Sequence, residues 1–218
     1  TTVAFLAQTL AIFMGFFTRV VFTRTLSEGY VGINGLFTDI LNILSLSELG
    51  VGTAITYALY APIARRDIKK QQILMRMFRN FYRITAGFVL LAGLCLIPFL
   101  DILMKDRPDV NHLIIIYLLY LLNSVVSYLL IYKKTLVDAH QMNYITVMYH
   151  NGFLVLQDIC QIIVLLLTRN FILFLIVAVV CTMSGNICMS RKADRLFPYL
   201  KEPCKEQLPQ EERRDIFK

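Results

Sequence analysis

The residues that could do chemistry in this sequence are charged and polar side chains that interrupt long apolar segments. Arg19 lies near the end of the first apolar segment, with Arg24 just beyond it, and the second segment carries two acids, Asp39 and Glu48. If these segments cross a membrane, each Asp, Arg or Lys near a helix centre costs about 2.5–3.5 kcal/mol, and two unpaired acids in one span cost about 5–7 kcal/mol. We therefore expect these charges to face a bundle interior or a watery cavity and to have partners there.

The second apolar segment, residues 31–60, is long as well as polar. A regular helix of this length would reach about 45 Å, which exceeds the hydrocarbon core of a bilayer. We expect it to tilt, bend or break, with Gly50–Val51–Gly52 as the favoured point. The helical period places Glu48 nearly opposite a polar face formed by Asp39, Asn42, Thr53, Tyr57 and Tyr60. Two interpretations remain open: a structural ion pair, for which Arg19 is the nearest partner in sequence, and a pathway for a substrate or ion.

A second polar stripe runs along the fifth apolar segment. Its members follow helical spacing and are His150, Gln157, Asp158 and Gln161, with Asn151 adjacent. A polar face of this length in lipid either packs against other helices through hydrogen bonds or lines a cavity, and both interpretations remain open. The milder stripe of the fourth segment, Tyr120, Asn123, Ser124 and Ser127, favours helix packing through small residues.

No enzyme signature accompanies these residues. The sequence has no H-E-x-x-H, P-loop or G-x-S-x-G motif, its three histidines are isolated, and its five cysteines form no C-x-x-C pair. We therefore expect no catalytic residue, no metal and no cofactor.

The elements that carry these residues are predicted to be membrane-spanning helices. Of the 218 residues, 57% are hydrophobic and 17% are charged, against about 45–50% and about 25% in soluble domains. The composition excludes a soluble globular domain and predicts an all-α integral membrane protein, a bundle of six transmembrane helices. The expected spans are residues 3–23, 31–60, 81–100, 112–132, 145–168 and 171–190.

The basic residues predict the orientation of these spans. Seventeen of the 22 Lys and Arg residues fall in the segments 61–83, 132–144 and 191–218, which places those segments and both ends of this chain in the cytoplasm. We expect residues 61–80 to lie at the membrane interface against anionic lipids rather than to bind nucleic acid, because no folded basic module accompanies them. Residues 191–218 are expected to be the start of a linker that leads elsewhere.

The stretch from Arg19 to Asp67 is the part of the sequence that resembles a known family, and it contains the segment VGINGLFTDILNILSLSELG. This segment resembles the polysaccharide-transporter (Wzx-type) oligosaccharide flippases of the multidrug/oligosaccharidyl-lipid/polysaccharide exporter superfamily. The later segments LIIIYLLYLLNSVVSYLLIYKKTLVDAHQ and RNFILFLIVAVV…SRKADRLFPYL are similar to the same family, mostly through their apolar pattern.

The resemblance implies a function and a set of site residues. Flippases of this family have two six-helix lobes and move undecaprenyl-pyrophosphate-linked glycans across the bacterial cytoplasmic membrane. This chain resembles the N-terminal lobe, whose partner would be a C-terminal lobe of the same or another chain. The resemblance implies that Arg19 and Arg24 meet the pyrophosphate or acidic sugars. Asp39, Asn42, Glu48 and Tyr57 would contact the glycan or take part in coupling to H⁺ or Na⁺.

Three alternatives remain beside the flippase. A drug/cation antiporter of the same superfamily would prefer a cavity dominated by carboxylates, and Arg19 weighs against it. A membrane-embedded enzyme would need a large catalytic loop, whereas the predicted loops are short. A non-transporting membrane scaffold would use the polar stripes for packing alone.

Overall fold

The computed structural model describes residues 2–45, 51–100 and 112–201, and within these ranges the chain is helical and contains no strand. The α-helices are α1 (Thr2–Thr25), α2 (Glu28–Ser45), α3 (Val51–Ala64), α4 (Ile68–Leu96), α6 (Leu113–Tyr128), α7 (Ile131–Ala139), α8 (Asn143–Thr168) and α9 (Phe171–Leu196). Two short 3-10 helices, η2 (Ile97–Phe99) and η3 (Pro198–Lys201), follow α4 and α9. Glu48, one of the predicted site residues, lies outside the described residues.

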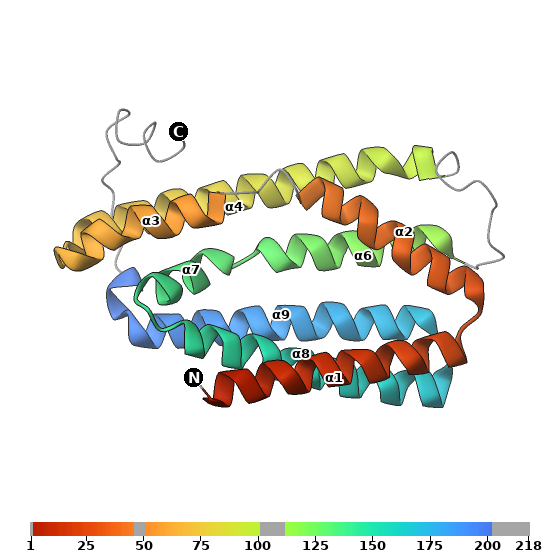
Figure 1. Cartoon of the computed structure of the whole chain (residues 1–218). Coiled ribbons are helices and arrows are strands. Elements are labelled where there is room, and N and C mark those ends of the chain that lie inside the picture. Colours follow the sequence, from red (N-terminus) through yellow and green to blue (C-terminus); the bar gives the residue numbers. More distant parts are fainter. Residues whose placement is uncertain (1, 46–50, 101–111, 202–218) are drawn as a thin grey trace.

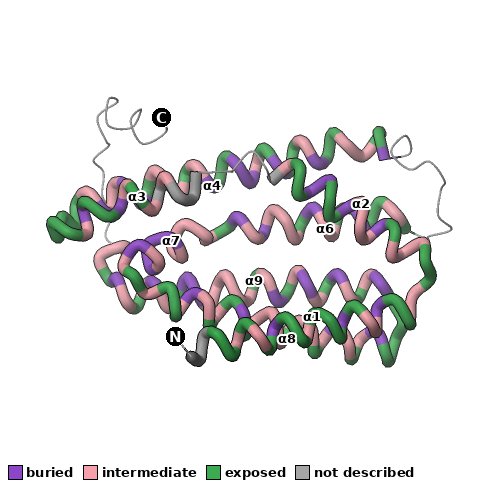
Figure 2. Tube along the Cα trace, viewed as in Figure 1, coloured by how far each residue is buried: buried purple, intermediate pink, exposed green. Residues whose placement is uncertain are grey.

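The long helices lie side by side along one common direction (Figure 1). From one edge of the bundle to the other, α4 packs on α6, α6 on α9, α9 on α8 and α8 on α1. In Figure 2, α1 is exposed along much of its length, whereas buried residues gather on the inner helices. Exposed side chains on α1 include Phe13 (59%) and Phe16 (65%). Such apolar exposure suits contact with lipid rather than with water.

Five stretches of the described chain are long and apolar enough to cross a membrane. They are Phe5–Thr25, Ile68–Phe99, Leu113–Ala139, Asn143–Thr168 and Phe171–Leu196. The prediction of an all-helical, multi-pass membrane protein is confirmed in this form. The expected second span contains two helices, α2 and α3, which point in different directions (Figure 1), in agreement with the interruption expected in this segment. Gly50, part of the favoured point, lies outside the described residues.

The fourth apolar segment differs from its prediction. The segment 132–144 was expected to be a loop, but α6 is followed after a short break by α7, which extends to Ala139. Leu130 takes a left-handed conformation at the break, with φ of 70°. Helix resumes because Leu136 and Val137 are fully buried in the core, next to Ala139. A loop would have exposed these three apolar side chains.

An ion pair secures α7 to α9. Lys133 Nζ lies 2.7 Å from Asp194 Oδ2, and the two side chains are 14% and 23% exposed. Lys133 was expected to be a loop residue that only orients the chain. Its side chain instead joins two helices, because helical α7 turns it toward α9.

The segment after α9 is held against the start of α4. The Tyr199 hydroxyl donates to Gln71 Oε1 at 2.5 Å, and Gln72 Nε2 donates to the Tyr199 carbonyl at 2.6 Å. Gln71 is itself buried and donates to the Pro62 carbonyl at 3.2 Å. These bonds tie η3, α4 and the end of α3 together.

This arrangement predicts a loss of stability at high pH. Burial raises the pKa of Tyr199 from its ordinary value of 10.0 to about 12. The unfolded chain therefore releases this proton at a lower pH than the folded chain, so the contribution of Tyr199 is complete below pH 10 and is lost as the pH rises toward about 12. Thermal unfolding in detergent should show a larger drop between pH 9.5 and 11.5 for the wild type than for Tyr199→Phe. Equal drops would contradict the prediction, since lysine titration affects both proteins alike.

Candidate functional site

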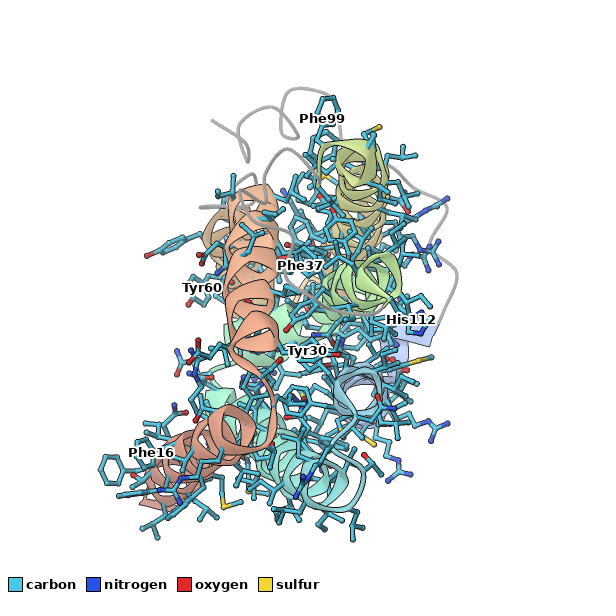
Figure 3. The ribbon with its side chains drawn as sticks, turned by 90° about the vertical axis from the view of Figure 1, so that its right-hand side faces the viewer. Phe16, Tyr30, Phe37, Tyr60, Phe99 and His112 are labelled. Atoms are coloured by element: carbon cyan, nitrogen blue, oxygen red, sulfur yellow. The ribbon has the colours of Figure 1, made fainter. Side chains whose placement is uncertain are left out.

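The described site residues of the predicted transport path all lie exposed on α1, α2 and α3. Arg19 and Arg24 are on α1, Asp39 and Asn42 on α2, and Tyr57 on α3. These three helices lie along one side of the molecule in Figure 3, where Phe16 and Tyr60 also project. The structure thus distributes the predicted residues over three helices, of which α1 and α3 lie at opposite edges of the bundle in Figure 1, instead of gathering them in one closed pocket.

The charges on this side are not neutralised by one another. Within the described part of the chain, neither Arg19 nor Asp39 forms an ion pair, so the Arg19–Asp39 pair considered from the sequence is absent. Their helices follow one another in the chain but separate in space, because α1 packs on α8 whereas α2 packs on α6 and α4. Two charged side chains in apolar helices are therefore left exposed.

A polar contact next to Arg19 was not expected from the sequence. The Tyr120 hydroxyl on α6 hydrogen-bonds Asn34 Oδ1 on α2, and Arg19 lies within electrostatic range of that hydroxyl. Asn34 lies one turn before Thr38 and Asp39 on the same helix, which is the signal that could have drawn attention to it. The contact joins a hydroxyl and an amide on two helices within electrostatic range of Arg19.

Two exposed tyrosines continue this side along α3. Tyr57 is 72% exposed and Tyr60 is 43% exposed. Their rings meet edge to face, with centroids 5.7 Å apart. Their exposure agrees with the face predicted from the helical period, and the pair offers aromatic surface next to hydroxyl groups.

One half of the α8 stripe packs helices together. Asn151 Nδ2 donates to Gln8 Oε1 at 2.8 Å, and Thr18 Oγ1 donates to Asp158 Oδ1 at 3.1 Å. Both bonds join α8 to α1. Gln161 is buried and donates to the Phe174 carbonyl of α9 at 3.2 Å. These residues hold helices together, which is one of the two interpretations left open by the sequence.

The other half of the stripe lines a cavity. His150 and Gln157 face a cavity of about 200 Å³ between α6, α7, α8 and α9. Lys134 of α7 and Thr182 and Asn186 of α9 face the same cavity. Sequence reasoning had missed Lys134, because the segment that carries it was expected to be a loop. Both interpretations of the stripe therefore hold, each for different members.

Comparisons with protein-family models, with curated proteins and with solved structures find no match for this chain. The geometry is therefore the main support for a function. Its features are exposed polar residues on α1, α2 and α3, hydrogen bonds between α1 and α8, and a cavity lined in part by polar side chains between α6, α7, α8 and α9.

Proposed function

We propose that this chain is one lobe of a two-lobe membrane transporter that moves anionic lipid-linked oligosaccharides across the bacterial cytoplasmic membrane. The observation that carries the proposal is the exposure of Arg19 and Asp39, neither of which has an ion-pair partner among the described residues, on predominantly apolar helices. A charged side chain facing hydrocarbon is costly. The side of the molecule formed by α1, α2 and α3 is therefore best covered by water, by a second lobe or by a polar substrate. The resemblance of residues 19–67 to oligosaccharide flippases supports the same conclusion.

The residue types suit such a substrate. A pyrophosphate crosses hydrocarbon too slowly unaided, because it must give up its hydration. Arg19 and Arg24 would replace that hydration with charge-assisted hydrogen bonds. Asp39 and Asn42 would bind sugar hydroxyls, and the ring pair of Tyr57 and Tyr60 would pack against sugar rings.

The second lobe would face α1, α2 and α3. Two lobes that rock against each other would open the polar path alternately to each side of the membrane. Coupling to H⁺ or Na⁺ would supply the driving force, and Asp39 is the described carboxylate on this side that is suited to that role. In this arrangement both ends of the chain lie in the cytoplasm.

The first test is substitution of Arg19 in the complete two-lobe transporter. Arg19→Ala should lower the rate of glycan translocation in proteoliposomes by about tenfold to a hundredfold, the usual worth of a hydrogen bond to a charged group. Arg19→Lys should retain part of the rate. The matched control is Arg195→Ala, which removes an exposed cation at the end of α9. A folded Arg19→Ala protein with full transport would remove Arg19 from the path, and neutral results at both Arg19 and Asp39 would favour a scaffold.

The exposure of Asp39 also gives weight to a cation antiporter. In that case Asp39→Asn would abolish cation-coupled efflux of a cationic drug, while Arg19→Ala would leave it intact. The flippase predicts the reverse order for glycan transport, with Arg19 the more sensitive position. Measuring both substrates with both variants separates the two functions.

A further inference from the structure

The cavity between α6, α7, α8 and α9 has the lining of an anion site. Lys134 supplies a cation, and His150, Gln157, Thr182 and Asn186 supply groups able to donate hydrogen bonds. Among the described residues, no carboxylate lines the cavity. The acid one turn beyond Lys134 is Asp138, whose Oδ1 already accepts a bond from Thr146 Oγ1 at 2.6 Å. The lining is therefore positive on balance.

Three of the polar side chains that line the cavity are also unengaged, whereas Asn186 and Thr146 of the lining already form hydrogen bonds. In the part of the chain that the structure describes, no hydrogen bond or ion pair occupies the side chains of Lys134, His150 or Gln157. The neighbouring Lys133 is paired with Asp194, and Asn151 on the same helix as His150 is paired with Gln8. Among the described residues, the unpaired side chains Lys134, His150 and Gln157 are thus on the side of α7 and α8 that faces the cavity.

An apolar groove adjoins this cavity on the outside of α8. It encloses about 230 Å³ and is formed by Met148, Tyr149, Gly152, Phe153 and Leu156. Tyr149 and Phe153 line both the groove and the cavity. Met148 and Leu156 are about half exposed, at 50% and 48%. A cavity whose lining carries one lysine and several polar groups among apolar side chains therefore lies next to an apolar groove, with Tyr149 and Phe153 shared between them.

We propose that the cavity and groove together bind an anionic phospholipid. The phosphate group occupies the cavity beside Lys134, and an acyl chain follows the groove past Gly152. A cavity of about 150 Å³ already holds a molecule the size of benzene, so the observed 200 Å³ is sufficient for a phosphate group. Lysine and neutral donors suit phosphate, and the groove suits a hydrocarbon chain.

This lipid site is separate from the proposed transport path. The path residues lie on α1, α2 and α3, whereas the lipid site lies on α6, α7, α8 and α9. Either proposal can fail while the other holds. The site would join α7 to α8 and α9 at the break after α6, where Asn186 Nδ2 already donates to the Val126 carbonyl at 2.9 Å.

The test uses the absence of tryptophan from this chain. Leu156→Trp places a single indole in the groove, and Leu91→Trp places one at an exposed position on α4 (65% exposed). Each protein is reconstituted in vesicles that contain brominated phosphatidylglycerol or brominated phosphatidylcholine, which quench indole fluorescence on contact. We expect phosphatidylglycerol to be preferred about fivefold at position 156, the effect of one lysine on an anionic lipid, and no preference at position 91.

Two further variants locate the phosphate and the chain. Lys134→Gln in the Leu156→Trp background should abolish the preference for phosphatidylglycerol. Gly152→Leu should fill the groove and reduce the phosphatidylglycerol that native mass spectrometry finds retained. A β-carbon at Gly152 meets nothing within 4 Å, so this variant tests the site even where Lys134→Gln fails to fold. Gly87→Leu on α4, where a β-carbon also meets nothing within 4 Å, is the matched control.

Three results would overturn the proposal. The first is equal quenching by the two lipids at position 156. The second is a preference that survives Lys134→Gln in a folded protein, together with full lipid retention in Gly152→Leu. The third is stabilisation of the detergent-solubilised chain by inorganic phosphate but not by phosphatidylglycerol, which would assign the cavity to a free anion.

Discussion

Phe37→Ala should destabilise this protein by about 3–5 kcal/mol, the usual cost of removing a fully buried phenylalanine. Phe37 on α2 has no exposed surface. Its ring meets Tyr117 and Tyr120 of α6 edge to face, with centroids 5.1 and 5.8 Å apart. The substitution removes both ring contacts and leaves a cavity between α2 and α6. The free energy of unfolding, measured by circular dichroism in mixed micelles during an SDS titration, checks this value.

The effect should reach the candidate site, because Phe37 holds the helix that carries Asp39 and Asn42. Thr38–Asn42 should exchange amide hydrogens faster in Phe37→Ala than in the wild type. Phe88→Ala is the matched control, since Phe88 on α4 is 56% exposed and its loss leaves no internal cavity. A cost at position 37 no larger than that at position 88 would show that α2 is not held by this contact.

Gly93→Ala should destabilise the protein by about 1–3 kcal/mol through overpacking. A β-carbon at Gly93 would lie 2.3 Å from Leu121 Cδ1 and 3.2 Å from Leu121 Cγ. Leu121 is itself buried at 1% exposure and has little room to move. The close approach of α4 and α6 is fixed further by the Tyr117 hydroxyl, which donates to the Gly93 carbonyl at 2.8 Å.

A double variant tests this explanation directly. Leu121→Val removes part of the side chain that a β-carbon would strike, so Gly93→Ala/Leu121→Val should lose less stability than the sum of the two single variants. Gly87→Ala on the same helix is the control, because a β-carbon there meets nothing within 4 Å. It should stabilise the helix by about 0.5–1 kcal/mol. Additive losses at positions 93 and 121 would show that the two residues do not compete for space.

The local pattern of apolar and polar residues was sufficient to predict much of the fold. Runs of apolar residues long enough for a bilayer predicted helices that the structure contains, such as α8 and α9, because helix length and hydropathy are properties of neighbouring residues. The single face predicted for Asp39, Asn42 and Tyr57 is instead divided between α2 and α3, because the apolar segment forms two helices. The prediction of a loop at 132–144 was wrong. The two lysines at 133 and 134 indicated a loop more strongly than the short apolar run after them indicated a helix. That run forms α7 because other helices bury it.

The sequence by itself determined that this protein is a bundle of membrane helices with polar stripes at particular positions. Tertiary structure decided what each stripe does. Asn151 and Asp158 found partners on α1, more than a hundred residues away in the chain, whereas His150 and Gln157 on the same helix face a cavity. Periodicity gives the direction of a side chain relative to its own helix, but the atom it meets depends on the packing of a different helix. The same packing leaves Arg19 and Asp39 apart, with each charge exposed on its own helix.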